Sequence, residues 1–167
     1  MTTRREYPDR PLVGVGVIVL RGDAVLLVRR GREPGRGRWA LPGGAQRVGE
    51  TVEEAGRREL REEAGLEVGA LRFVGYVDGI HRDAEECVRF HYTILDLAAA
   101  WQGGAPACGD DAEAAEFVAV AELAARDVGA ETLRMVEAAG RLLGEEASKA
   151  GLRPDPPKAR GLSKPVP

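Results

Sequence analysis

The chain has 167 residues, of which 44% are hydrophobic and 31% charged, and its formal net charge is −3. This length suits one domain with a substantial core, and the near-balanced charge excludes a globally basic surface for nucleic acid or membranes. No apolar run reaches the roughly 20 residues that span a bilayer, and Met1 to Arg10 lacks the apolar core of a secretion signal. Cys87 and Cys108 form no zinc or redox motif, so we expect reduced thiols in a cytoplasmic protein.

The first half of the chain predicts a β-hairpin followed by a helix. Leu12 to Leu20 carries apolar or small residues on both faces, as in a central strand, and Ala24 to Arg30 follows after a tight turn. Thr51 to Ala64 has the pattern of a capped helix, because Thr51 and Glu54 are spaced as a capping box and Gly65 follows as a left-handed stop.

The second half adds further strands and a second long helix. The predicted elements are Leu71 to Ile80, Cys87 to Trp101 and Glu116 to Val120 as strands, an acidic loop from Gly103 to Glu113, a helical turn from Ala121 to Ala125, and an amphipathic helix from Glu131 to Leu143. We therefore expect an N-terminal extension (1–10), one domain (11–145) and a flexible tail rich in proline and basic residues (146–167).

Three glutamates share one face of the helix predicted before Gly65. Glu59, Glu62 and Glu63 stand at i, i+3 and i+4, within an arc of about 100°. Their mutual repulsion destabilises an isolated helix, and hard divalent cations, which prefer carboxylate oxygens, would offset that repulsion. The spacing alone is more typical of a solvated, salt-bridged helix, because arginines are interleaved with the acids and Arg58 makes an i, i+4 pair with Glu62.

A glycine pair and an acid before the helix favour the functional interpretation. Gly43 and Gly44 carry no side chains, which lets the backbone turn sharply and approach a ligand or metal ion. Glu50 stands just before the capped helix, from where it can reach a basic residue such as Arg58. An orienting Arg–Glu pair is the support that a metal-binding carboxylate needs.

The spacing of these residues resembles the signature of the Nudix family. Gly44, Glu50 and the run RELREEAGL from Arg58 to Leu66 reproduce the Nudix box without a departure. The resemblance extends from about Pro11 to Leu143 in the order of the elements. It implies an α/β (α+β) fold in which a mixed β-sheet is sandwiched between helices, in agreement with the irregular alternation of strands and helices described above.

By this resemblance, the box supplies both the metal ligands and the catalytic groups. The ligands of Mg²⁺ or Mn²⁺ are expected to be glutamate carboxylates and one backbone carbonyl, namely Glu59, Glu62, Glu63 and the carbonyl of Gly43. Glu62 is expected to bind the ion or to orient or deprotonate the attacking water. Arg58 is expected to orient Glu59, with help from Glu50.

A further acid is expected from a loop late in the domain, as in other members of the family. Asp110, Asp111 and Glu113 lie in such a loop, and Glu116 begins the next predicted strand. Each of these acids taken singly is typical of a solvated surface. We select Asp111 and Glu113 as the candidates for an additional metal ligand.

Substrate choice lies outside the box, and there the chain resembles short bacterial ADP-ribose pyrophosphatases. The similar segments include Arg89 to Tyr92 and Gly109 to Asp111. This implies hydrolysis of ADP-ribose to AMP and ribose 5-phosphate, although a longer-known ADP-ribose class carries a proline where Val77 to Asp83 has none. The alternative is a house-cleaning nucleoside triphosphate pyrophosphatase. A domain that only senses nucleotides is a third interpretation, but it predicts a damaged box.

The expected substrate contacts are cationic and aromatic side chains outside the box. Arginines bind phosphates through paired hydrogen bonds, and aromatic rings stack on bases, but both residue types also serve surfaces and cores. The partner is expected to be a small nucleotide, and the resemblance allows a homodimer that no segment specifies. The candidate contacts are Arg29, Arg30, Arg38, Trp39, Arg89 and Tyr92.

Overall fold

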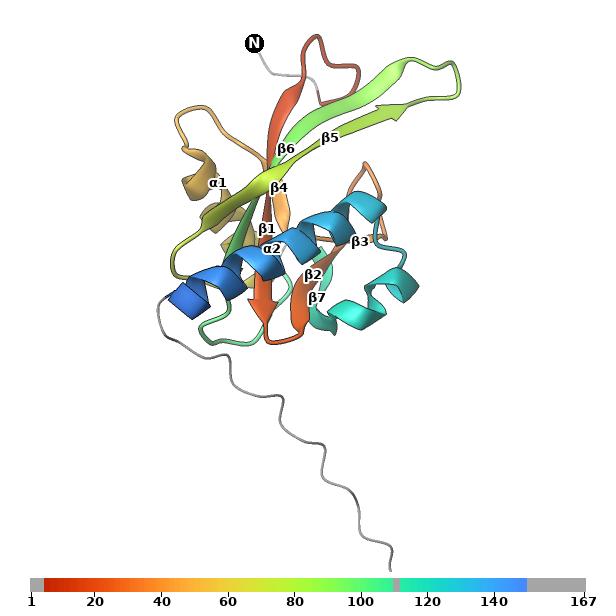
Figure 1. Cartoon of the computed structure of the whole chain (residues 1–167). Coiled ribbons are helices and arrows are strands. Elements are labelled where there is room, and N and C mark those ends of the chain that lie inside the picture. Colours follow the sequence, from red (N-terminus) through yellow and green to blue (C-terminus); the bar gives the residue numbers. More distant parts are fainter. Residues whose placement is uncertain (1–4, 110–111, 150–167) are drawn as a thin grey trace, which may run out of the picture.

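The computed structural model describes residues 5–109 and 112–149, which build one mixed sheet with helices around it (Figure 1). The strands are β1 (Leu12–Arg21), β2 (Ala24–Arg30), β3 (Trp39–Ala40), β4 (Gly43–Ala45), β5 (Arg72–Arg82), β6 (Val88–Ala100) and β7 (Ala112–Ala119). The helices are α1 (Val52–Ala64), the short 3₁₀ helix η1 (Val120–Arg126) and α2 (Ala130–Lys149).

The strand order β3-β2-β1-β6-β5 makes the sheet mixed, as predicted. β1 runs parallel to β6 from Leu12 to Leu20, whereas its pairings with β2 and β4 are antiparallel. β2 pairs with β1 only beside their turn, at Leu20 and Val25, and β4 takes its place along Gly14 to Gly16. β7 extends the sheet on the outer side of β2. The sheet therefore has a local edge at β4.

Helices α1 and α2 cover opposite faces of this sheet, which confirms the predicted sandwich. Side chains alternate across β1, so Val15 and Val17 face one side and Ile18 faces the other. Val15 and Val17 pack with Leu60 of α1, and Ile18 packs with Met135 of α2. In Figure 1, α2 crosses the front of the sheet, and the outer ends of β5 and β6 extend away from both helices.

Local hydrogen bonds define both ends of α1, as the sequence predicted. Thr51 Oγ1 accepts from the Glu54 N–H at 3.2 Å, and the Glu54 carboxylate accepts from the Thr51 N–H at 2.8 Å. The hydrogen bonds that the Glu54 carboxylate accepts from the Thr51 N–H and the Thr51 hydroxyl lower the pKa of that carboxyl. The helix ends at Gly65, whose φ of 62° is left-handed and whose N–H donates to the Arg61 carbonyl at 3.1 Å. The fixed start sets the rotation of the helix and hence the direction of its acidic face.

Two element boundaries differ from the prediction by more than two residues. β7 begins at Ala112 rather than at Glu116, because Ala112 is buried in the core beneath α1 and pairs with β2. α2 continues past the predicted end at Leu143 to Lys149, since a packed helix can extend through polar residues once it is nucleated. The predicted tail thus begins inside this helix, and its remainder, residues 150–167, lies outside the described residues.

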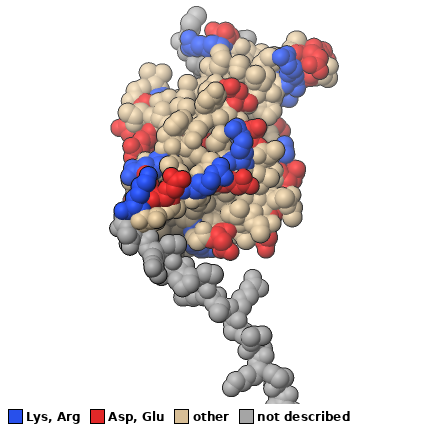
Figure 2. Space-filling view, viewed as in Figure 1, with Lys and Arg blue, Asp and Glu red and all other residues tan. Residues whose placement is uncertain are grey.

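The surface over α2 carries charges of both signs. Figure 2 shows acidic and basic side chains interspersed on this face, and Arg72 pairs there with Glu146 at 2.8 Å across β5 and α2. None of the helices within residues 5–109 and 112–149 combines the length and apolar content needed to cross a bilayer.

Candidate active site

Two glutamates of α1 meet the backbone of β4. The Gly43 N–H donates to Glu63 Oε2 at 2.8 Å. A β-carbon at Gly44 would lie 2.4 Å from Glu59 Oε1 and 2.7 Å from Glu59 Oε2, so a residue without a side chain is needed to leave room for that carboxylate. The glycine pair Gly43–Gly44 thus holds both carboxylates at the local edge of the sheet.

Arg58 connects two of the acids around this edge. Its Nε and Nη2 donate to the two oxygens of Glu50 at 2.5 and 2.9 Å, and its Nη1 donates to Glu59 Oε1 at 2.5 Å. The three side chains are only 13–20% exposed, so solvent screens these pairs weakly. The predicted contact between Arg58 and Glu50 is present, and it fixes the arginine that holds Glu59 in place.

This cluster has a clear electrostatic signature. Hydrogen bonds from the Arg58 guanidinium lower the pKa of the Glu50 carboxyl to about 2, with a further contribution from the Arg47 N–H. Conversely, Glu50 and, to a smaller extent, Glu59 raise the pKa of Arg58. Glu50 therefore stays ionised well below neutral pH, and the orientation of the arginine does not depend on pH near neutrality.

Glu62, the third glutamate of the acidic face, is directed toward solvent. Its side chain is 48% exposed, and its ion pairs are long, at 3.3 Å to Arg58 and 3.4 Å to Arg47. Exposed pairs of this length contribute little to stability. The Glu62 carboxylate can therefore exchange these partners for water, which is a requirement for a group that accepts a proton from water.

The donors at the glycine pair suit a hard divalent cation. In residues 5–109 and 112–149, no three His, Cys, Asp or Glu side chains are grouped so that they could hold a metal ion, so a cage of three glutamates is not assembled. Glu59 and Glu63 instead share the backbone of Gly43–Gly44. Mg²⁺ usually takes one or two carboxylates and completes its shell with waters and substrate phosphates. The residues present therefore fit such an ion.

The chain passes over the end of α1 just before β7. A β-carbon at Gly109 would lie 1.5 Å from the Glu62 carbonyl oxygen, so the two backbones are in direct contact. Asp111, one of the two extra ligands expected, lies outside the described residues. Glu113, the other, lies on β7 and not in the predicted loop. There it forms an ion pair with Arg29 at 3.5 Å, and no described contact joins it to the glutamates of α1.

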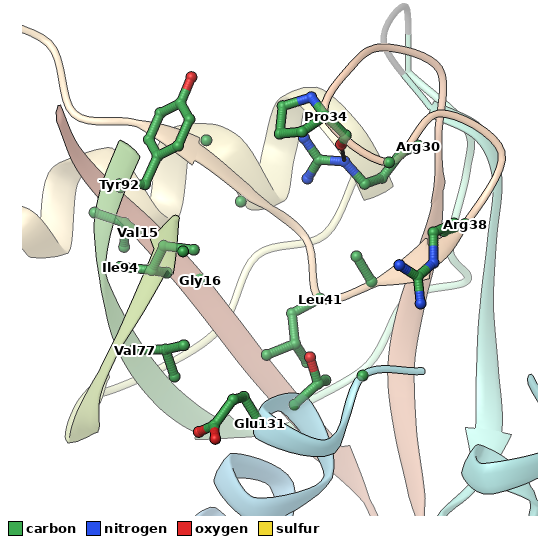
Figure 3. A pocket seen from close by; sticks show the side chains of 18 of the residues that line it. Val15, Gly16, Arg30, Pro34, Arg38, Leu41, Val77, Tyr92, Ile94 and Glu131 are labelled. Carbon is green, nitrogen blue, oxygen red and sulfur yellow. Dashed lines mark hydrogen bonds between the residues drawn. The ribbon is translucent and has the colours of Figure 1, made fainter. Parts of the chain in front are cut away.

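A cavity of about 330 Å³ borders the glycine pair. Strands β1, β6 and β5 form one side of it, and residues 33–41 with the start of α2 form the other. Figure 3 shows Arg30 and Arg38 on one flank and the apolar Val77 and Ile94 on the opposite one. Arg30 Nε donates to the Pro34 carbonyl at 2.8 Å, which anchors its flank. The volume lies near the lower limit of small-molecule sites, which is about 300 Å³.

Predicted substrate contacts divide into two groups in the structure. Those that line the cavity are Arg30, Arg38, Trp39 and Tyr92. Arg29 does not line it, because successive side chains on β2 point to opposite faces and Arg29 pairs with Glu113. Arg89 does not line it either, since it pairs with Glu6 of the N-terminal segment at 3.4 Å.

Several residues of the cavity were not found from the sequence. Arg5, which was assigned to an extension outside the domain, lines the cavity, as do Asp96 of β6 and Glu131 near the start of α2. Arg5 lies far in sequence from most residues that line the cavity, so no local sequence pattern predicts its position there. Asp96 did carry a signal, because it is a single acid within the apolar run from Ile94 to Ala98.

Comparisons with known proteins agree with this arrangement. The family model of the NUDIX domain matches residues 10–139. An ADP-ribose pyrophosphatase from Methanocaldococcus jannaschii is 40% identical over 107 residues, which cover 64% of this chain and 61% of that protein. An oxidized purine nucleoside triphosphate hydrolase from Mus musculus is 46% identical over 80 residues, which cover 48% of this chain and 51% of that protein.

A solved structure extends the agreement to three dimensions. The crystal structure of a MutT NUDIX hydrolase from Burkholderia pseudomallei matches with a TM-score of 0.66 and 31% identity, over 77% of this chain and 98% of that chain. The two relatives above are matched over less than two thirds of their own lengths. The family model, in contrast, covers most of this chain, including the acidic helix α1 and the glycine pair. The chain therefore belongs to the Nudix family.

Proposed function

We propose that the chain is a hydrolase that depends on a divalent cation and cleaves the diphosphate linkage of a nucleoside diphosphate derivative. Its preferred substrate in this proposal is ADP-ribose, which yields AMP and ribose 5-phosphate. The observation that carries the proposal is the convergence of Glu59 and Glu63 on Gly43–Gly44, beside a cavity large enough for part of a nucleotide.

The residues divide the work of hydrolysis among them. Water adds its hydroxyl to one phosphorus, and the bridging oxygen leaves with the other phosphate and takes up a proton. A cation held by Glu59 and Glu63 would neutralise phosphate charge and lower the pKa of the attacking water. Glu62, half exposed and loosely paired, accepts the proton of that water. Arg58, fixed by Glu50, keeps the Glu59 carboxylate in its binding position before the substrate arrives.

Support for ADP-ribose comes from a relative and from the cavity. The relative that is 40% identical over 107 residues is named an ADP-ribose pyrophosphatase. Trp39 and Tyr92 give the cavity aromatic surface for a planar ring, and Arg30 and Arg38 add positive charge for phosphate groups. A bulky ligand with a ring at one end and a diphosphate near the glycine pair fits this distribution.

An oxidised or otherwise non-standard nucleoside triphosphate is the second candidate. The mouse relative, 46% identical over 80 residues, is named an oxidized purine nucleoside triphosphate hydrolase. The products separate the two candidates. ADP-ribose yields two monophosphates, whereas a nucleoside triphosphate cut between its α and β phosphates yields a nucleoside monophosphate and inorganic pyrophosphate. A domain that only senses nucleotides would bind them and release neither set.

The test is a substrate panel in which the products are identified by chromatography. We expect the wild type with Mg²⁺ to turn over ADP-ribose faster than any nucleoside triphosphate, and excess EDTA to stop turnover. Glu63→Gln should lose orders of magnitude in rate, while Glu137→Gln, on the exposed face of α2, should keep the wild-type rate. Full turnover in EDTA would refute the role of the cation, and a panel led by a triphosphate would reassign the substrate.

A further inference from the structure

Asp96 is a buried acid that the proposed hydrolysis does not use. It lies on β6, is 4% exposed, and is the one charged side chain classed as buried among the described residues. It also lines the cavity. The acidic face of α1 lies on the opposite side of the sheet, so Asp96 is separate from the glutamates proposed to bind the cation.

The neighbours of Asp96 in the sheet leave room for its carboxylate. The backbone registers place Gly16 of β1 beside Asp96, Gly43 of β4 beside Gly16, and Gly75 of β5 on the other flank. A β-carbon at Gly16 would lie 2.2 Å from Asp96 Oδ1, so the carboxylate leans across β1 toward β4. Because the neighbouring strands carry glycines at these positions, no side chain within the sheet stands between this acid and the cavity.

No described protein group pairs with this carboxylate. Within the described parts of the chain, no hydrogen bond or ion pair reaches Asp96, and burial alone raises its pKa to about 6. At neutral pH the group is therefore mostly ionised. None of the fully buried side-chain oxygens in the described residues lacks a partner, so the unpaired oxygens of Asp96 are open to the cavity and not sealed inside the core. A carboxylate that faces a cavity without a protein partner is available to a ligand in that cavity.

We propose that Asp96 accepts a hydrogen bond from an N–H donor on the nucleobase, which for ADP-ribose is the exocyclic amine of adenine. This inference rests on the proposed function. An ionised carboxylate only accepts hydrogen bonds, so it selects a donor and repels phosphate. Leu41, Ile94 and Trp39 give part of the cavity wall an apolar or aromatic character that suits a planar base.

The test compares substrates that differ in one group of the base. ADP-ribose presents an amine donor, and inosine diphosphate ribose presents a carbonyl acceptor at the same carbon. We expect the wild type to favour ADP-ribose in kcat/KM by at least about 100-fold, because a buried acceptor is left unpaired or opposed by the oxo analogue. Asp96→Asn, whose amide both donates and accepts, should bring the two substrates within about threefold of each other.

A second variant and a matched control complete the design. Asp96→Ala should lose activity toward ADP-ribose at least about 10-fold without gaining activity toward the oxo analogue. Asp78→Asn makes the same chemical change on β5 outside this cavity, where Asp78 accepts from Thr93 Oγ1 at 2.9 Å, and should keep the wild-type ratio. If the ratio of the two substrates is the same in the wild type and in Asp96→Asn, the inference is overturned.

Binding measurements separate this inference from the proposed function. Calorimetry with AMP and IMP in the presence of Mg²⁺ reads base selection without hydrolysis. In one outcome, the wild type hydrolyses no diphosphate and still binds AMP at least about tenfold more tightly than IMP, with Asp96→Asn removing that difference. This result would overturn the proposed activity and support the role of Asp96. In another outcome, the wild type hydrolyses ADP-ribose while Asp96→Asn changes only the affinity for 2′-deoxy or 3′-deoxy AMP. That result would show that Asp96 contacts the sugar and would overturn base selection.

Discussion

Replacement of Asp96 by asparagine should reveal how burial of this carboxylate affects folding. Burial raises the pKa of Asp96 from 3.8 to about 6, so the folded chain holds the proton more tightly than the unfolded chain does. The stabilisation that protonated Asp96 contributes is therefore fully present below pH 3.8 and is lost as the pH rises through the folded pKa of about 6. Asp96→Asn does not titrate, so this contribution is absent from the variant.

The size of the effect follows from the two pKa values. Each unit of difference corresponds to about 1.36 kcal/mol, and most of the shift is expressed between about pH 7 and pH 4.5. The free energy of unfolding of the wild type should therefore rise by about 2 kcal/mol relative to Asp96→Asn over this interval. In a domain of this length, that corresponds to roughly 4–8 °C in the midpoint temperature.

Urea unfolding of both proteins at about pH 7 and about pH 4.5 measures this difference directly. Carboxyls such as Glu50 titrate in both proteins, so subtraction of one stability from the other isolates Asp96. Asp78→Asn should follow the wild type. A gap between the wild type and Asp96→Asn that is equal at the two pH values would show that Asp96 has an ordinary pKa, and the account of an unpaired buried charge would then fail.

Further changes probe the glycine pair and the acids around it. Gly44→Ala would place a β-carbon 2.4 Å from a Glu59 oxygen, and the displaced carboxylate should lower kcat/KM by about 100-fold. The control Gly140→Ala, whose β-carbon would meet no atom within 4 Å, should keep its activity and raise the free energy of unfolding by about 0.5–1 kcal/mol. Equal activity of the two variants would contradict the clash. Glu50→Gln should remove a stabilisation that is complete above the ordinary pKa of 4.5 and is lost as the pH falls toward 2; coincident acid-unfolding curves for variant and wild type would exclude it. Glu63→Gln should keep the wild-type circular dichroism spectrum, because the loss of one like charge relieves repulsion on α1, and a variant that unfolds would assign Glu63 a structural role.

The acidic helix and its caps were predictable because their signals are local. Thr51, Glu54 and Gly65 define the helix through bonds that span at most four residues, and the spacing of Glu59 and Glu63 then places both on one face. Their position against the glycine pair follows from the family resemblance rather than from spacing. The order of strands and helices was sufficient to predict a mixed sheet between helices.

The cavity could not be predicted in the same way, because segments far apart in the sequence build it. Arg5 reaches it from outside the expected domain, and Asp96 faces it only because β6 runs parallel to β1 with Gly16 at the matching position. Glu113 was placed in a loop because the run of alanines at the start of β7 has weak strand propensity, and pairing with β2 overrides that propensity. Arg29 and Arg30 look equivalent in sequence, and the structure directs only Arg30 to the cavity.

In the proposed enzyme, β4 at the local edge of the sheet separates the cavity that would select the substrate from the carboxylates that would hold the cation. Both glycines contact the carboxylates of α1, Gly43 through its N–H to Glu63 and Gly44 through the room it leaves for Glu59, and both also border the cavity on the α2 side. Side chains such as Leu41 and Val77 can therefore be exchanged to reshape the cavity while the cation-binding carboxylates stay in place. In this proposal, residues on opposite faces of one sheet specify the substrate and the cleavage, so a change in one set need not touch the other.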